Sequence, residues 1–122
     1  MCGIVGYTGA RQALPFLIDG LTTLEYRGYD SAGVALVTPQ DDILQIKCKG
    51  RVAALAELCE RFDTASTCGI AHTRWATHGE PSDANAHPHQ DCAGTLSVVH
   101  NGIVENYQAL QDELSRAGHT FR

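Results

Sequence analysis

The order of strand-like and helix-like segments constrains this fold more than any other feature of the sequence. Two segments, residues 14–24 and 51–62, keep apolar residues at helical spacing. Strand-like runs flank them at residues 2–7, 31–37, 43–50 and 68–75. The second and third runs are joined by the turn-rich TPQDD, which predicts a hairpin. Strands in pairs with helices between them predict a mixed α/β layered domain.

The C-terminal half of the sequence begins with a long segment that shows no periodicity. Residues 76–93 read as a loop, and loops of this length inside a compact domain are often functional. Beyond it, residues 95–100 predict a strand and residues 104–119 predict a helix that ends at Gly118. The apolar side of this helix is expected to be buried through Tyr107, Leu110 and Leu114.

Composition and charge narrow the class of protein. A net charge of -5 argues against nucleic-acid binding, which needs a basic surface. No apolar stretch approaches the roughly 20 residues of a membrane helix, and the N-terminal segment lacks the basic start and apolar core of a secretory signal. We therefore expect a cytoplasmic protein that binds neither nucleic acid nor membranes.

Cysteine usage points to one unusual position. Five cysteines form an odd set without tight spacing, which favours reduced thiols, and four of them are expected to be small buried hydrophobes. Cys2 differs because removal of Met1 would make it the amino terminus. Since an α-amino group has a pKa of about 8, Cys2 would then carry a nucleophilic thiol and its own base. Its position is also compatible with simple packing in the first strand.

The dipeptide Asn101-Gly102 has two interpretations. Between apolar runs it is a strong signal for a hairpin turn. Alternatively, the Asn101 side-chain amide and the Gly102 backbone N–H could form an oxyanion hole. An asparagine at the end of a strand can serve both purposes.

The run HTRWATHG places four candidate substrate-binding residues next to the long loop: Arg74, Trp75, Thr77 and His78. The planar fork of an arginine fits a carboxylate, which suggests an amino acid or another acidic substrate. The alternative is a surface arginine beside a core tryptophan.

A zinc site is a further hypothesis for the long loop, through His87, His89 and Cys92. Structural zinc sites usually have four ligands in paired short spacings, and no second pair is present. We therefore expect no metal site, and the role of the loop histidines stays open.

Four blocks of the sequence resemble a known family in the family's order: MCGIVGY, LEYRGYDSAGVA, GIAHTRWATHGEPSDANAHPH and VVHNGIVENY. They are similar to the glutaminase domain of the glutamine:fructose-6-phosphate aminotransferases, or glucosamine-6-phosphate synthases, within the class II glutamine amidotransferases. The resemblance runs from Cys2 to Tyr107. It implies the fold of N-terminal-nucleophile hydrolases, an αββα sandwich in which helices cover two stacked sheets.

The resemblance also implies roles for individual residues and requires no cofactor. Cys2 would attack the side-chain amide of L-glutamine, form a thioester and release ammonia, with its α-amine carrying the proton. Asn101 and Gly102 would hold the oxyanion, and Arg27 would lie near the nucleophile. The glutamine carboxylate would be held by Arg74, Thr77 and His78, and Trp75 would gate the passage of ammonia.

Family members pass the ammonia to a C-terminal sugar isomerase half that makes glucosamine 6-phosphate from fructose 6-phosphate, and full-length relatives typically dimerise through it. Because the family's glutaminase region continues past GHTFR, we expect residues 1–122 to be one partial domain, truncated at its C-terminal side, without the isomerase domains. Two alternatives remain. The chain could come from another class II enzyme, of the amidophosphoribosyltransferase, asparagine synthetase or glutamate synthase type, or it could be a non-catalytic binding module on the same fold.

Overall fold

The computed structural model describes residues 2–28, 30–75 and 85–121, and for Arg27 it describes the backbone alone. Four strands form an antiparallel sheet in the order β1-β4-β2-β3. These are β1 (Gly3–Thr8), β2 (Ser31–Val37), β3 (Ile43–Lys49) and β4 (Cys68–Arg74). The hairpin predicted for residues 31–50 is confirmed, since β2 pairs with β3 along its whole length.

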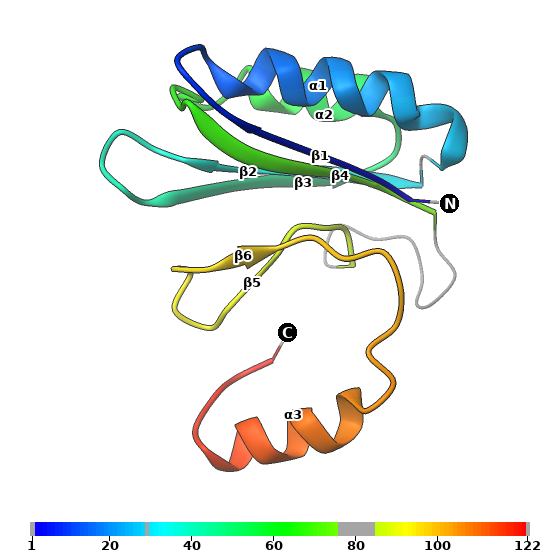
Figure 1. Cartoon of the computed structure of the whole chain (residues 1–122), viewed down its shortest axis with the longest axis vertical. Helices are drawn as coiled ribbons and strands as arrows, with labels where there is room; N and C mark the ends of the chain where they lie inside the picture. Colours follow the sequence, from blue (N-terminus) through cyan, green and yellow to red (C-terminus); the bar gives the residue numbers. More distant parts are fainter. Residues whose placement is uncertain (1, 29, 76–84, 122) are drawn as a thin grey trace.

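Two helices, α1 (Ala13–Leu24) and α2 (Val52–Cys59), cover one face of this sheet (Figure 1). The spacing of apolar residues explains this packing. Helix α1 buries residues four positions apart, and alternate residues of β2 face the helices from the sheet. The core residues of these three elements are Ala13, Leu17, Leu21, Val52, Leu55, Cys59, Ala32, Val34 and Leu36. Full burial of a leucine in such a core contributes roughly 1.5–3 kcal/mol.

The opposite face of the sheet carries polar residues and a smaller second layer. Strand alternation places His72 and Arg74 of β4 on this face, beside Ser31 and Gly33 of β2. A two-stranded ladder lies below them in Figure 1, formed by β5 (His89–Gln90) and β6 (Ser97–Val98). The strand predicted for residues 95–100 is therefore present but shorter.

The prediction of a loop without structure over residues 76–93 is wrong where it can be checked, because β5 lies inside it. Two residues are too few to show an alternating pattern, and β5 exists through its pairing with β6. Residues 76–84 lie outside the described part of the chain. A short 3₁₀ helix, Glu25–Arg27, follows α1.

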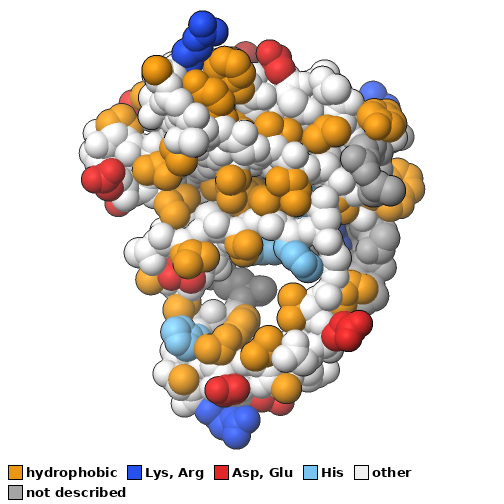
Figure 2. Space-filling model, viewed as in Figure 1, with side chains coloured by type: hydrophobic (Ala, Val, Ile, Leu, Met, Phe, Trp, Pro, Cys, Tyr) orange, Lys and Arg blue, Asp and Glu red, His pale blue; other side chains and the backbone are white. Residues whose placement is uncertain are grey.

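The predicted C-terminal helix is confirmed as α3 (Tyr107–Arg116), and Gly118, with φ +98°, follows its end. Its predicted burial is wrong: Tyr107, Leu110 and Leu114 are 54%, 40% and 40% exposed. The amphipathic pattern is real, but no described element packs closely enough to bury this side of the helix. Figure 2 shows a hollow between this lower part and the sheet, with apolar side chains around it.

The elements thus stack in the order helices, sheet, small ladder, helix (Figure 1). This is the expected mixed α/β layered arrangement, with a far smaller second half. Among the described residues, no helix is long and apolar enough to cross a membrane.

Candidate active site

Cys2 lies at the end of the sheet where β1 begins and β4 ends. Gly3 pairs with Thr73, so the antiparallel register brings Cys2 beside the residues that follow Thr73. The backbone N–H of Trp75 donates to the Cys2 sulfur at 3.3 Å, and the thiol lies 3.8 Å from the Trp75 carbonyl oxygen. An N–H donor at this position stabilises negative charge on an attacking sulfur.

Asn101 reaches the same residue from a distant part of the chain. Its Nδ2 donates to the backbone carbonyl oxygen of Cys2 at 3.2 Å. Gly102 follows with φ +141°, and residues 103–106 form no strand before α3 begins. The hairpin-turn interpretation of Asn101-Gly102 is therefore wrong, since a hairpin requires a second strand.

A pocket of about 220 Å³ brings four of the predicted site residues together: Cys2, Arg74, Trp75 and Gly102. His87, His89 and His100 also line it. Two other predicted residues, Thr77 and His78, lie outside the described residues, as does the side chain of Arg27. The Arg27 backbone belongs to the 3₁₀ helix after α1.

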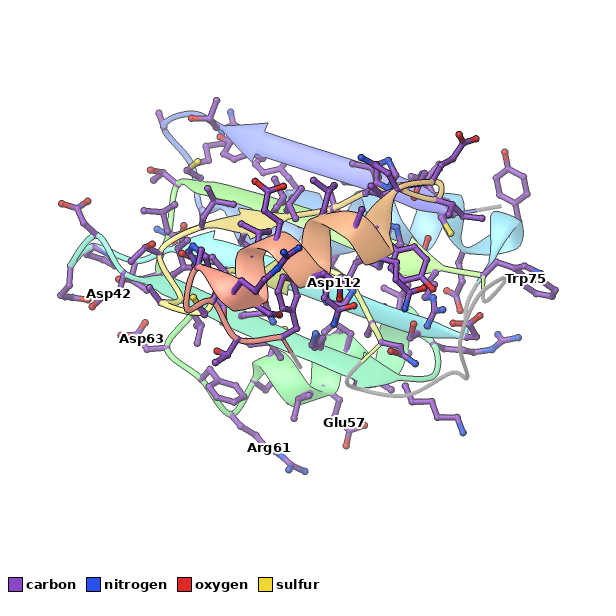
Figure 3. The ribbon with its side chains drawn as sticks, turned by 90° about the horizontal axis from the view of Figure 1, so that it is seen from below. Asp42, Glu57, Arg61, Asp63, Trp75 and Asp112 are labelled. Atoms are coloured by element: carbon purple, nitrogen blue, oxygen red, sulfur yellow. The ribbon has the colours of Figure 1, made fainter. Side chains whose placement is uncertain are left out.

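Arg74 supplies positive charge at this pocket. It is 8% exposed, and its guanidinium donates to the backbone carbonyl oxygen of Asn85 at 3.2 Å. Trp75 is 50% exposed, and Figure 3 shows its side chain at the margin of the molecule. The alternative of a surface arginine beside a core tryptophan is wrong on both counts, because the arginine is buried and the tryptophan is exposed.

The rings of His72, His87 and His89 pack against one another at the pocket, which His87 and His89 line. The ring centroids of His72 and His87 are 4.4 Å apart, as are those of His87 and His89. Burial lowers the pKa of all three, and it lowers the pKa of His87 to about 3 with further contributions from His72, His89, Arg74 and Lys47. The three rings are therefore neutral at pH 7.

Lys47 of β3 binds the segment that carries His87 and His89. Its ammonium group donates to the backbone carbonyl oxygens of Ala86 at 2.9 Å and Pro88 at 3.3 Å. In the zinc hypothesis Cys92 would join His87 and His89, but its sulfur lies 3.4 Å from Nδ1 of His119. The described residues contain no group of three metal-ligating side chains that could hold an ion.

Sequence reasoning missed His72, a fully buried residue whose Nε2 lies 2.7 Å from Oδ1 of Asn101. A signal for it existed, because His72 stands two positions before Arg74 and strand alternation places both on one face. It also missed His100, which precedes Asn101 and lines the pocket.

Comparisons with known proteins show which family this chain is similar to. The family model for class-II glutamine amidotransferases matches residues 29–120. The isomerizing glutamine–fructose-6-phosphate aminotransferase of Symbiobacterium thermophilum is 58% identical over 122 residues, and that of Clostridium tetani is 55% identical over 122 residues. The alignments cover 100% and 99% of this chain and 20% of each relative, so the chain spans about a fifth of their length.

Among solved structures, the glutamine phosphoribosylpyrophosphate amidotransferase from B. subtilis, complexed with ADP and GMP, matches with a TM-score of 0.79 at 25% identity. The match covers 100% of this chain and 26% of that one. This likeness confirms the predicted N-terminal-nucleophile hydrolase fold. The family model, the close relatives and the shared fold together show that the chain belongs to the class-II glutamine amidotransferases.

Proposed function

We propose that the pocket at Cys2 hydrolyses the side-chain amide of L-glutamine and releases ammonia. The observation that carries this proposal is the meeting of distant residues at Cys2. Asn101 donates to its backbone, Trp75 donates to its sulfur, and both Arg74 and Gly102 line the same pocket. A thiol, amide donors and a cation in one pocket are the groups that amide hydrolysis of an amino acid needs.

The chemistry follows from the roles of these groups. The Cys2 sulfur attacks the amide carbon of glutamine while the thiol proton passes to the α-amine of Cys2, which is free once Met1 has been removed. A carbon–sulfur bond forms, and the carbonyl oxygen becomes an oxyanion that accepts hydrogen bonds from Asn101 and Gly102. Collapse of this intermediate breaks the carbon–nitrogen bond. The protonated α-amine of Cys2 gives its proton to the leaving nitrogen, which departs as ammonia. Water then hydrolyses the thioester to glutamate.

The remaining predicted residues would hold the substrate. Arg74 pairs with the glutamine carboxylate, assisted by Thr77 and His78. Trp75 would border the exit for ammonia, and Arg27 would act near the nucleophile. The burial of Arg74 supports its pairing with the carboxylate, since an ion pair is stronger in an environment of low dielectric constant.

For the whole protein, we propose that the ammonia is used to convert fructose 6-phosphate into glucosamine 6-phosphate. Relatives at 52–58% identity that are named as isomerizing glutamine–fructose-6-phosphate aminotransferases support this assignment. On this proposal, residues 1–122 are one partial glutaminase domain of a cytoplasmic, dimeric enzyme whose sugar isomerase domains lie elsewhere in the protein.

The test is ammonia release from glutamine by the intact protein with Met1 removed, compared with its Cys2→Ser and Cys2→Ala variants. Loss of ammonia release in both variants is expected. In parallel, a glutamine-analogue electrophile should add one adduct, located on Cys2 by mass spectrometry. Native rates in the variants would refute the proposal, and a folded protein with no adduct would favour the non-catalytic module.

A second candidate acceptor comes from the solved neighbour, which is named as a phosphoribosylpyrophosphate amidotransferase. The two acceptors are separated by supplying glutamine with fructose 6-phosphate or with phosphoribosyl pyrophosphate and following which sugar phosphate is aminated. Amination of fructose 6-phosphate alone is expected.

A further inference from the structure

The hydrogen-bond partners of Asn101 determine the orientation of its side-chain amide. A backbone carbonyl oxygen can only accept, so the Asn101 atom that lies 3.2 Å from the Cys2 carbonyl oxygen must be Nδ2. Oδ1 then faces His72, 2.7 Å from its Nε2. Because Oδ1 is an acceptor, Nε2 of His72 must carry the proton that is shared between them.

The surroundings of His72 keep this arrangement in place. The ring is fully buried, packs against the tilted ring of His87 and leaves Nδ1 without a hydrogen-bond partner in the described part of the chain. Burial lowers the pKa of His72, with a smaller contribution from Arg74, so the ring is neutral at pH 7. A neutral ring has one N–H, and the hydrogen bond to Asn101 places it on Nε2.

We propose that His72 is a positioning residue that acts through Asn101. Its Nε2–H holds Oδ1 of Asn101 and thereby keeps Nδ2 turned toward Cys2. Nδ2 carries two hydrogens, of which one is donated to the Cys2 carbonyl oxygen and the other is available to an oxyanion. If the amide turned over, Oδ1 would face a carbonyl oxygen and no donor would remain. This inference rests on the proposed function, since it assigns Asn101 to the oxyanion.

The experiment is a double-mutant cycle in the intact protein with Met1 removed. Asn101→Ala should lower kcat for ammonia release by about 10²–10³-fold. His72→Leu should lower kcat by about tenfold, as expected for the loss of one orienting hydrogen bond, and should change KM by less than about twofold. His72→Gln keeps a donor near the Nε2 position and should recover most of the rate.

The distinguishing result is the double variant. If His72 acts through Asn101, then His72→Leu combined with Asn101→Ala should be no slower than Asn101→Ala alone. A further tenfold loss in that background would show a general structural role and would overturn the inference. A His72→Leu variant with native kcat would overturn it as well.

The control is Thr73→Val at the neighbouring, equally buried position of β4, whose hydroxyl has no partner among the described residues. It should leave kcat unchanged. Rates are normalised to the fraction of Cys2 that reacts with the glutamine analogue, so partial unfolding is not counted as slow chemistry. If Cys2→Ala remains active, it is the proposed function that fails and not the positioning role.

A measurement on the unsubstituted protein does not depend on any variant folding. Nitrogen-15 chemical shifts of labelled histidine report the tautomer, and His72 should show a neutral ring protonated on Nε2 at pH 7. A ring protonated on Nδ1, or on both nitrogens, would contradict the inference.

Discussion

The backbone carbonyl group of His87 lies against Gly33 of β2, at the place where any other residue would carry its Cβ. A Cβ there would also come 2.8 Å from Cβ of Lys47, the residue that holds the carbonyl groups on either side of His87. The sheet therefore accepts the pocket-lining segment only because β2 has no side chain at this point.

We expect Gly33→Ala to force this segment away from the sheet. The substitution should lower the free energy of unfolding by about 1–3 kcal/mol, the usual cost of overpacking, and should reduce ammonia release because His87 and His89 line the pocket. Chemical denaturation and an ammonia assay measure both effects. Gly6→Ala in β1 is the control, since a Cβ there meets nothing within 4 Å and should change stability by less than about 0.5 kcal/mol. Equal effects of the two substitutions would contradict this account.

A second prediction compares two leucines in helices. Leu17 of α1 is fully buried against the sheet, whereas Leu110 of α3 is 40% exposed. Leu17→Ala should lower the free energy of unfolding by roughly 2–5 kcal/mol, and Leu110→Ala by less than about 0.5 kcal/mol. Urea denaturation of both variants gives the comparison. A large loss from Leu110→Ala would show that α3 is packed in solution.

The same contrast shows what the sequence could predict. The spacing of Leu17 and Leu21 predicts both the helix and its buried side, and the structure covers that side with β1 and with the more distant β4. For α3, the amphipathic pattern predicts a helix but cannot say whether anything covers its apolar side. The amphipathic pattern is local, and burial depends on what other parts of the chain supply.

The site was predictable to a similar extent. Cys2, Arg74 and the Asn101-Gly102 pair could be selected because each has distinctive chemistry and the motifs follow a family's order. The contact between His72 and Asn101 could not, because it depends on how residues beyond β4 return to the sheet. Buried histidines in a strand resemble ordinary core residues until their partners are known.

A third prediction concerns acid stability. Burial lowers the pKa of His72, His87 and His89, so these side chains stay neutral in the folded protein. In the unfolded chain a histidine has a pKa of about 6.5. As the pH falls below about 6.5, the unfolded state takes up protons that the folded state does not. The free energy of unfolding should therefore fall, by at most about 1.4 kcal/mol per pH unit for each histidine.

Urea unfolding between pH 7 and pH 4 measures this slope. His87→Gln should reduce this slope by up to about 1.4 kcal/mol per pH unit, the contribution of one proton, because it removes the group whose pKa is lowered to about 3. Lys47→Met should also reduce it, since the ammonium group contributes to the low pKa of both His87 and His89. A slope that is the same in all three proteins would show that other groups cause the acid sensitivity.

The last prediction concerns the nitrogen of Cys2. In the proposed chemistry this nitrogen accepts the thiol proton, which it can do only as a free amine. A protein that keeps Met1 has the same thiol and the same pocket residues, but its Cys2 nitrogen is an amide without basic character. Ammonia release should then fall by about 10²–10⁴-fold, the usual contribution of general acid–base catalysis. Intact mass identifies the two forms, and treatment of the retained form with a methionine aminopeptidase should restore the rate as the mass falls by one methionine. Equal rates in both forms would mean that another group takes the proton, and the neutral histidines that line the pocket, His87 and His89, would then be the first candidates.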